Sequence, residues 1–252
     1  MTNEKKQTPY ECDICNDDHW IVGKDEDGNS KMTHCKCYRQ HAIRNMQKVI
    51  CQRANLQLSD LEKFHFGNFD PELQYSKKAQ GDAKEMLKLS KKWSTGKGEK
   101  FLTLSGGVGI GKTHLAKASL RYLIENMYGE NEVETVRSVY YAPATEVAVK
   151  SRSFDDGLSE RYRLSLQKAD YLVLDDVGVE WDPRGYMQSF YHSIIDHRYN
   201  YNLNTMMTTN LSTNGRSKES LLKRLGERVV SRITHTGIGI VFLGSGEDIR
   251  RK

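Results

Sequence analysis

The sequence predicts an α/β domain built on a parallel sheet and preceded by a small cysteine-rich module. Three observations carry this prediction. A glycine-rich loop of the form G-x-x-x-x-G-K-[ST], at residues 106–113, stands between an apolar run and a helical pattern. A second apolar run, at 171–174, ends in two aspartates. Four of the five cysteines lie between Cys12 and Cys37.

Length and composition bound the class of protein. A chain of 252 residues with 37% hydrophobic and 28% charged residues fits a soluble globular protein of one domain, or one domain plus a small module. No apolar window approaches the length of a membrane span, and no apolar run follows the first residues, so we expect a cytoplasmic protein with no membrane partner. The net charge of +5 permits nucleic-acid binding without requiring it.

The cysteines come first along the chain and have the spacing of a metal site. Cys12 and Cys15 are separated by two residues, a spacer of 19 residues follows, and Cys35 and Cys37 are separated by one. Two short pairs at this distance suit tetrahedral Zn²⁺, with the spacer as a hairpin between the runs 20–22 and 31–33. The pattern therefore predicts a zinc-ribbon-like domain whose closed ligand set makes the metal structural.

Other interpretations of this module remain open. The cysteines could form a disulfide pair or stay unpaired, although a chain without a secretion signal is expected in a reducing compartment. His19, His34 and His41 lie close enough to replace one ligand, and Cys51 is most simply a small buried apolar residue. A partner protein or nucleic acid would meet the basic residues around the ligands, which are Lys31, Lys36, Arg39, Arg44 and Lys48.

The glycine-rich loop has the chemistry of a phosphate cradle. Glycines let several backbone N–H groups converge on one polyphosphate, and the helix predicted over 114–128 adds its dipole. Lys112 can reach the β and γ phosphates, and the Thr113 hydroxyl can bind Mg²⁺. The alternative is a structural turn. The predicted nucleotide-binding residues are Gly106, Gly107, Val108, Gly109, Ile110, Gly111, Lys112, Thr113 and His114.

Acidic residues follow the second apolar run, at the end of a strand that reads as buried on both faces. In parallel sheets ligands bind at this end of the strands. Asp175 is expected to hold the Mg²⁺ together with Thr113, and Asp176 to orient or deprotonate the attacking water. The competing interpretation is a strand cap on an ordinary loop.

Further polar residues extend the candidate site. A third apolar run, 205–209, ends in Asn210, where a strand could aim the amide at the γ-phosphate. Arg228 and Arg232 are four residues apart and hence on one helical face, and arginine suits phosphate oxygens. They could equally form surface ion pairs with acids such as Glu219 and Glu227. The lysine-rich stretch 77–100 is favoured as a solvated helix face over a DNA-contacting one.

Taken together, these motifs resemble the AAA+ ATPases of the DnaC/DnaI helicase-loader and IstB group. The resemblance covers residues 65–252, and the cysteine module before it is similar to the N-terminal zinc domain of many loaders. It rests on the segments 106–113, 151–157, 169–178, 194–199, 208–211, 227–232 and 246–250.

The resemblance implies a fold and residue roles. The family fold is a P-loop AAA+ domain with a five-stranded parallel sheet and helices on both faces, and the runs 101–105, 137–142, 170–175, 204–209 and 238–243 supply five candidate strands. Asn210 would be sensor 1, Arg232 the arginine finger with Arg228 in support, and Arg250 a sensor-2-like residue. Residues 1–52 would be a zinc-binding helicase-interaction domain, 53–75 a linker and entry to the ATPase, and 76–252 the AAA+ domain.

Two departures from the family pattern bear on activity. The second acid, Asp176, is shorter than the glutamate of many AAA+ proteins, so slow turnover is expected. Only 42 residues follow Asn210, which predicts a reduced lid and a greater dependence on a neighbouring subunit.

The expected function is therefore an ATPase that uses ATP and Mg²⁺, self-associates through its ATP interfaces, and loads a replicative DnaB-type hexameric helicase onto single-stranded DNA in replication initiation. Hydrolysis would depend on assembly or on DNA. Stacking and phosphate contacts to the DNA could come from aromatic and basic residues, although the two tyrosines among them are favoured as core: Tyr140, Tyr141, Arg152, Phe154 and Arg161.

Three alternatives remain. A transposition-assisting ATPase of IstB type shares the ATPase core, but that group generally lacks a cysteine module. A zinc-dependent adaptor that binds nucleotide without hydrolysing it is disfavoured by the intact Asp175, Asp176, Asn210 and Arg232. A small-molecule kinase would close a basic lid over two substrates, and no such insert follows the aspartate pair.

Overall fold

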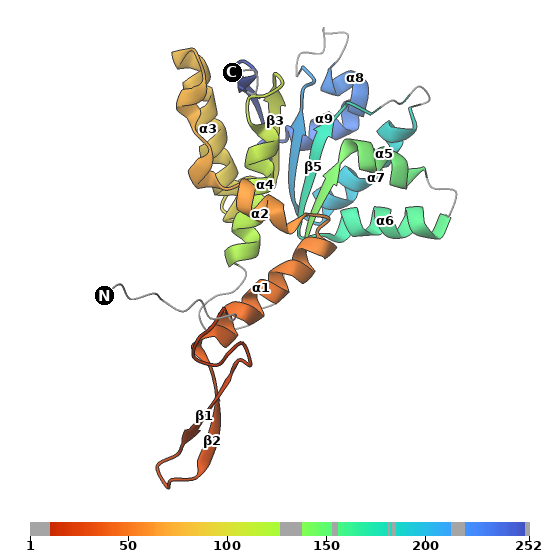
Figure 1. Ribbon diagram of the computed structural model, residues 1–252. Coiled ribbons are helices and arrows are strands. Elements are labelled where there is room, and N and C mark those ends of the chain that lie inside the picture. Colours follow the sequence, from red (N-terminus) through yellow and green to blue (C-terminus); the bar gives the residue numbers. More distant parts are fainter. Residues whose placement is uncertain are drawn as a thin grey trace. The chain divides into compact units, whose positions relative to one another are not determined.

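A computed structural model describes residues 11–126, 138–152, 156–180, 182, 185–212 and 220–249, apart from the side chains of 39–46 and 156 (Figure 1). The chain divides into two compact units, Met1–Val49 and Ile50–Lys252.

The first unit is built on a hairpin. Strands β1 (Trp20–Lys24) and β2 (Ser30–His34) pair antiparallel, with Trp20 opposite His34. The turn between them closes because the Asp25 carboxylate accepts from the backbone N–H groups of Asp27 and Asn29. Helix α1 (Lys36–Arg53) follows directly. The two runs expected on either side of the turn are thus the two strands.

The second unit contains a five-stranded sheet in the order β4-β5-β6-β3-β7, and every neighbouring pair is parallel. This confirms the predicted fold class. Each strand lies within a few residues of its predicted run, although Arg137 falls outside the described residues. The strands are β3 (Phe101–Gly106), β4 (Val139–Pro143), β5 (Tyr171–Val177), β6 (Asn204–Thr209) and β7 (Gly239–Gly244).

Helices cover both faces of this sheet, because each parallel crossover must return over one face or the other (Figure 1). One face carries α3 (Lys77–Ser94) and α4 (Lys112–Asn126). The opposite face carries α5 (Ala144–Ser151), α6 (Asp156–Lys168), α7 (Tyr186–Asn200), α8 (Leu221–Leu225) and α9 (Glu227–Ile233). The segment expected to be a linker holds α2 (Leu58–Lys63) and the 3₁₀ turns Phe66–Asn68 and Pro71–Leu73.

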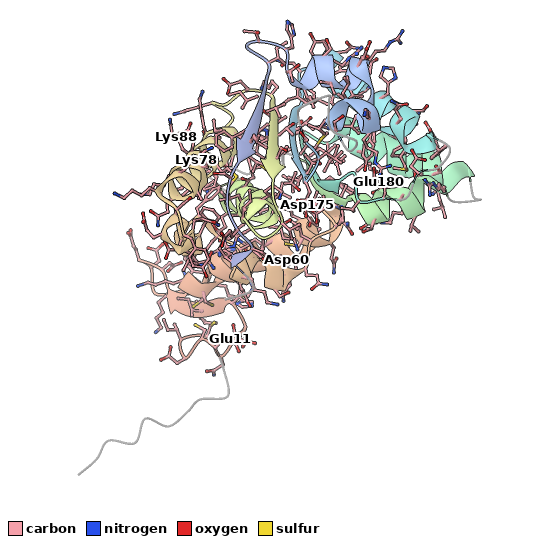
Figure 2. The ribbon with its side chains drawn as sticks, turned by 90° about the horizontal axis from the view of Figure 1, so that it is seen from above. Glu11, Asp60, Lys78, Lys88, Asp175 and Glu180 are labelled. Atoms are coloured by element: carbon pink, nitrogen blue, oxygen red, sulfur yellow. The ribbon has the colours of Figure 1, made fainter. Side chains whose placement is uncertain are left out.

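The lysine-rich stretch forms α3, which begins after Ser76, whose hydroxyl accepts from the backbone N–H of Ala79. The helix buries Met86 and Trp93 on its inner face. Its lysines point outward, as Lys78 and Lys88 show in Figure 2. This is the arrangement of a solvated helix face, as the sequence favoured.

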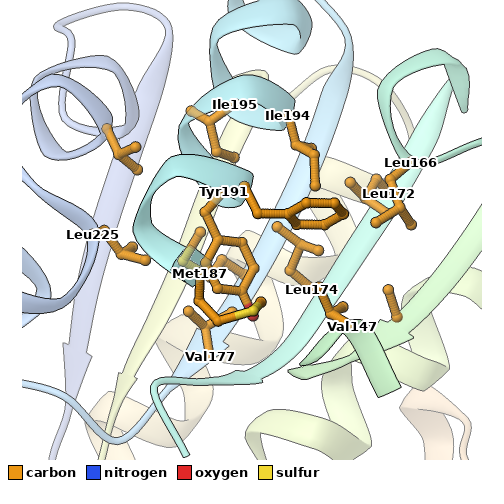
Figure 3. Close-up of a cluster of buried hydrophobic side chains, with 14 of the residues drawn as sticks. Val147, Leu166, Leu172, Leu174, Val177, Met187, Tyr191, Ile194, Ile195 and Leu225 are labelled. Atoms are coloured by element: carbon orange, nitrogen blue, oxygen red, sulfur yellow. The ribbon is translucent and has the colours of Figure 1, made fainter. Parts of the chain in front are cut away.

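The core between the sheet and α7 contains one buried cation. Figure 3 shows packed apolar side chains of this core, among them Tyr191, Ile194 and Leu172. The Arg198 guanidinium is fully buried and donates to the Thr205 hydroxyl and to the carbonyls of Leu166, Gln167, Ala169 and Asn204. Five acceptors satisfy the buried charge. Because they precede β5 and begin β6, Arg198 fixes how these two strands start side by side.

After Asn210 the described residues form α8, α9 and β7, so this part of the chain contains no separate helical lid. The sequence predicted a reduced lid from the short length after Asn210, and the two short helices α8 and α9 are the helices described there. None of the helices in the described ranges is long and apolar enough to cross a membrane.

Candidate nucleotide and metal sites

The glycine-rich loop runs from the end of β3 into α4, as predicted. Gly109 and Gly111 adopt φ angles of +77° and +94°, which side chains disfavour. Neighbours enforce the same choice, since a Cβ at Gly109 would lie 1.9 Å from an Asp248 carboxylate oxygen and one at Gly111 would lie 2.4 Å from the Phe69 ring. The loop is therefore enclosed by segments from both ends of the second unit.

A cavity of about 510 Å³ lies over this loop, within the size range of small-molecule sites. The loop and α4 supply one wall, strand-end residues a second, and the expected linker a third that is rich in aromatic side chains. The lining residues are Phe64, Asn68, Phe69, Asp70, Leu73, Gln74, Ala83, Val108, Gly109, Ile110, Gly111, Lys112, Thr113, His114, Asp176, Asn210 and Ile249. Polar loop and apolar wall together suit a phosphorylated ligand with an aromatic base.

Lys112 and Asn210 contact each other at the C-terminal end of β6. The Lys112 ammonium is 5% exposed and donates to the carbonyls of Gly106 at 2.9 Å and Gly107 at 2.6 Å, and to the Asn210 Oδ1 at 2.8 Å. The charge is thus held by three oxygens beside the loop. Phosphate oxygens entering the loop would replace these acceptors at little cost, because the lysine is already positioned.

Asp175 is a buried residue of β5 and lies beside Thr113. Its Oδ1 accepts from the Thr113 hydroxyl at 3.1 Å and from the Thr208 hydroxyl at 2.5 Å, and its Oδ2 accepts from the Tyr141 hydroxyl at 2.6 Å. A carboxylate and a hydroxyl at this separation form the hard oxygen set that Mg²⁺ prefers. The geometry therefore fits the metal role expected for these two residues.

Asp176 turns out of the strand toward the cavity. It adopts a φ of +55°, a left-handed conformation uncommon for a residue other than glycine, at an irregularity in the pairing of β5 with β6. The Thr208 hydroxyl accepts its backbone N–H at 2.8 Å. Thr208 thus binds both aspartates.

The sequence analysis did not identify the cavity-lining residues outside the glycine-rich loop and the strand ends, such as Phe69. It also missed Tyr141, Thr208 and Asp248 as residues of the site. For Thr208 a signal existed, because it precedes Asn210 by two positions and so lies on the same side of the strand. For the others the partners are far away in the sequence, and no local pattern marks them.

His114 anchors the aromatic wall. Its Nε2 donates to the His65 carbonyl at 3.1 Å, and its ring meets Phe64 edge-on. Burial lowers the pKa of His114, which favours the neutral ring. His114 therefore ties α4 to the segment that carries Phe69, in addition to lining the cavity.

The predicted arginines lie elsewhere. Arg232 pairs with Asp196 of α7 and lies over the Tyr199 ring, while Arg228 is exposed. Neither is among the residues that line the cavity. The ion-pair partner of Arg232 is thus Asp196, whereas the sequence suggested Glu227 or Glu219. Glu219 and Arg250 lie outside the described residues.

The five residues considered for DNA contact do not share one environment. Tyr141 is 7% exposed and points at Asp175, and Tyr140 packs against the core. Both are core residues, as favoured. Arg152 forms an ion pair, Arg161 is exposed, and Phe154 lies outside the described residues.

In the first unit the four cysteines converge, with all ligand atoms within 4.8 Å of one another. The Sγ atoms of Cys12 and Cys35 are 3.7 Å apart, and those of Cys15 and Cys37 are 3.4 Å apart. Four thiolates about 2.3 Å from one Zn²⁺ would stand about 3.8 Å apart in a tetrahedron. The cluster therefore fits a single tetrahedral metal ion, and all five cysteines are free of disulfides.

The surroundings of the cysteines favour thiolates unequally. The backbone N–H groups of Cys15 and Ile14 lower the pKa of Cys12 to about 7, whereas burial raises the pKa of Cys15 and of Cys37. Of the histidines weighed as substitutes, His19 contacts the cluster, with Nδ1 3.4 Å from the Cys37 Sγ, and the side chain of His41 lies outside the described residues. His34 stacks on Tyr38 instead. Cys51 lies apart from the cluster and is buried.

Comparison with known proteins identifies the family. The family model of IstB-like ATP-binding proteins matches residues 28–252, which is most of the chain. The chain belongs to this family. The glycine-rich loop, Lys112, Thr113 and Asp175 all lie within the residues that this family model matches.

Individual relatives are similar over part of the chain. The uncharacterized protein YdaV of Escherichia coli K12 is 32% identical over 134 residues, which is 53% of this chain and 48% of that protein. The replicative helicase loader DnaC of Buchnera aphidicola subsp. Acyrthosiphon pisum is 28% identical over 156 residues, 60% of this chain and 57% of that protein. The chain thus spans about half the length of these relatives.

Solved structures share the fold. A crystal structure of the DnaC helicase loader is 26% identical with a TM-score of 0.52, and the match covers 72% of this chain and 98% of that one. A structure of DnaI, 19% identical with a TM-score of 0.52, covers 77% of this chain and 94% of that one. The latter likeness concerns the fold alone.

Replacing Thr208 by valine keeps the shape and removes the hydroxyl that binds both aspartates. We expect the free energy of unfolding to fall by about 1 to 3 kcal/mol, because the Asp176 N–H loses its acceptor, and Mg²⁺–ATP to stabilise the variant less than the parent. Urea denaturation with and without Mg²⁺–ATP measures both effects. Thr209→Val is the control, since Thr209 donates to the Val177 carbonyl and does not touch Asp175. Equal stabilisation of parent and Thr208→Val by Mg²⁺–ATP would contradict this assignment.

Proposed function

We propose that the protein is an ATP-dependent loader that places a replicative DnaB-type hexameric helicase on single-stranded DNA. The observation that carries the proposal is that Lys112, Thr113 and Asn210 line one cavity, with Asp175 bound to the Thr113 hydroxyl. The second unit of the chain is similar to a DnaC helicase loader over nearly all of that structure. The likeness to the curated loader DnaC supports the same partner.

ATP would bind with its phosphates in the loop. Backbone N–H groups of 106–111 and the start of α4 face the phosphates, and Lys112 exchanges its carbonyl acceptors for phosphate oxygens. Thr113 and Asp175 would hold Mg²⁺, which when bound neutralises charge on the β and γ phosphates. Asp176 orients the attacking water, and Asn210 stands beside Lys112 at the γ-phosphate. Because Asp176 is short, we expect slow hydrolysis.

The arginines of α9 are proposed to act on a neighbouring subunit. Arg228 and Arg232 lie outside their own cavity, so they could stabilise only a nucleotide held by another copy. The γ-phosphate would then hold two subunits together, and hydrolysis would release them by removing that contact. In this account ATP is the assembly switch.

A mixing experiment tests the subunit arrangement. Arg232→Ala should bind ATP like the parent and lose hydrolysis by about 10³-fold or more, while Lys112→Ala should not bind ATP. Mixed together, the two variants should recover part of the activity, because each intact arginine can reach an intact loop. Arg163→Ala is the control and should hydrolyse ATP like the parent, because Arg163 is a partly exposed arginine of α6 that pairs with Glu160. Mixtures as inactive as the separate variants would refute action between subunits.

The cysteine cluster is proposed to hold one structural Zn²⁺ through Cys12, Cys15, Cys35 and Cys37. A unit of about 50 residues buries too little surface to fold without such a link, and a structural zinc ion supplies on the order of 10 kcal/mol. Four thiolates leave no open coordination position, so the metal would shape a contact surface and would take no part in hydrolysis.

Metal analysis tests this site. The purified protein should contain one zinc ion per chain, and Cys35→Ser should lose it and unfold the first unit while retaining ATP binding, because the ATPase unit has its own core. Cys51→Ala should keep the zinc, since Cys51 lies outside the cluster. Mass spectrometry under native conditions gives the stoichiometry. Retention of zinc by Cys35→Ser would disprove the assigned ligand set.

The hairpin of the first unit offers the helicase an apolar face. Val22 and Met32 are directly opposite each other on β1 and β2, and they are 71% and 62% exposed. Trp20 lies on the same face and is 43% exposed. Exposed apolar side chains gathered on one face favour contact with a partner protein.

Binding and loading assays test the function. With ATP, the parent should bind a DnaB-type hexamer and increase the amount of helicase on single-stranded DNA. Val22→Asp should weaken helicase binding about tenfold or more and leave ATP binding unchanged, because a buried charge is costly at an interface. Val149→Asp, an equally exposed valine on α5, is the control. If the protein did not bind the helicase but bound duplex DNA and recruited a transposase, the IstB-like alternative would replace this proposal.

A further inference from the structure

The hydroxyl of Tyr141 is bound to the carboxylate that the proposed function assigns to Mg²⁺. Tyr141 lies on β4, the edge strand next to β5, and donates to the Asp175 Oδ2 at 2.6 Å. A tyrosine hydroxyl is protonated near neutral pH, so here the hydroxyl is the donor and the carboxylate is the acceptor.

With this bond both oxygens of Asp175 are fixed. The Thr113 and Thr208 hydroxyls bind Oδ1, and Tyr141 binds Oδ2. Without the tyrosine hydroxyl, Oδ2 would lose its donor and the carboxylate could turn about its Cβ–Cγ bond. A metal would then have to order the carboxylate on binding, which costs affinity.

Tyr141 is itself held by the chain segment 54–60, here called the edge strap. The backbone N–H of Tyr141 donates to the Ala54 carbonyl at 2.8 Å, and the Tyr141 carbonyl accepts from the Asn55 side-chain amide at 3.0 Å. These are the backbone groups that an edge strand would otherwise leave open. Asn55 also donates to Glu146 at 2.6 Å, which ties the strap to α5.

The strap reaches the tyrosine ring as well. The Lys117 ammonium lies over the Tyr141 ring, 4.9 Å from its centroid, and pairs with Asp60 at 3.0 Å. Both members of this pair are largely buried, with side chains 16% and 14% exposed. The strap thus holds the backbone of Tyr141 directly, and it holds the ring indirectly, through the pairing of Asp60 with Lys117 of α4.

We propose that Tyr141 is a positioning residue for the metal carboxylate Asp175, and that the edge strap sets the affinity of the site for Mg²⁺ by holding Tyr141. The inference rests on the proposed nucleotide function. It assigns no chemistry to Tyr141, which acts through Asp175 alone. The strap follows α1 directly in the chain. A change in the hydrogen bonds between the strap and Tyr141 would therefore change the affinity for Mg²⁺.

The test separates metal binding from nucleotide binding. Tyr141→Phe keeps the ring and its contact with Lys117 and removes only the hydroxyl. Binding of a fluorescent ATP analogue is measured in EDTA and then against rising Mg²⁺. We expect the affinity in EDTA to stay within about twofold of the parent, and the Mg²⁺ concentration for half-maximal enhancement to rise about tenfold.

A second variant addresses the strap. Asn55 has a φ of +60°, so Asn55→Gly keeps the backbone conformation and removes the amide. It should shift the Mg²⁺ curve in the same direction by a smaller factor, about threefold. Tyr162→Phe is the control, because it removes a buried hydroxyl that has no hydrogen-bond partner and lies away from Asp175. Its Mg²⁺ curve should match that of the parent.

Each outcome decides a separate point. A parent-like Mg²⁺ curve for Tyr141→Phe would overturn the positioning role, and equal losses with and without Mg²⁺ would show a structural role only. A parent-like curve for Asn55→Gly would remove the strap from the inference. If Tyr141→Phe did not fold, the Asn55→Gly curve would decide. A parent that bound no nucleotide in either condition would instead refute the proposed function.

Discussion

The site depends on one constraint, the parallel alignment of the strands, which brings the ends of β3, β4, β5 and β6 to the same edge of the sheet. At this edge a single carboxylate, Asp175, accepts hydrogen bonds from three hydroxyls on three different elements. Because each donor comes from a separate crossover of the chain, the carboxylate is oriented only when the sheet is assembled. The site is therefore a consequence of tertiary structure and not of any local motif.

The alignment of β5 with β6 is fixed by Arg198 at the opposite end of these strands. Arg198 binds the carbonyls that lead into β5 and the first residues of β6, and so fixes the stagger between these strands. A shift of one residue would move Asp175 and Thr208 to opposite faces. A buried cation at the opposite end of these strands thus contributes to the position of the Asp175 carboxylate through the backbone alone.

Much of the fold could be predicted from the sequence because its signals are local. The glycine-rich loop, the apolar runs that become β3, β5 and β6, and the paired cysteines all place their chemistry within a few residues. Tyr141 could not be recognised, because its partner Asp175 is 34 residues away and its strap lies still further off in the chain. The segment expected to be a linker was likewise not recognisable as a wall of the cavity, since Phe69 meets the loop only after folding.

The edge strap has one more consequence, which concerns the ATPase unit on its own. Ala54 and Asn55 occupy backbone groups along the open side of β4. A fragment that began after residue 60 would retain the sheet and the loop but would present a bare strand rich in tyrosine to its neighbours. Such a strand recruits other strands into intermolecular sheets. The solubility of the isolated second unit therefore depends on a few residues that do not line the cavity.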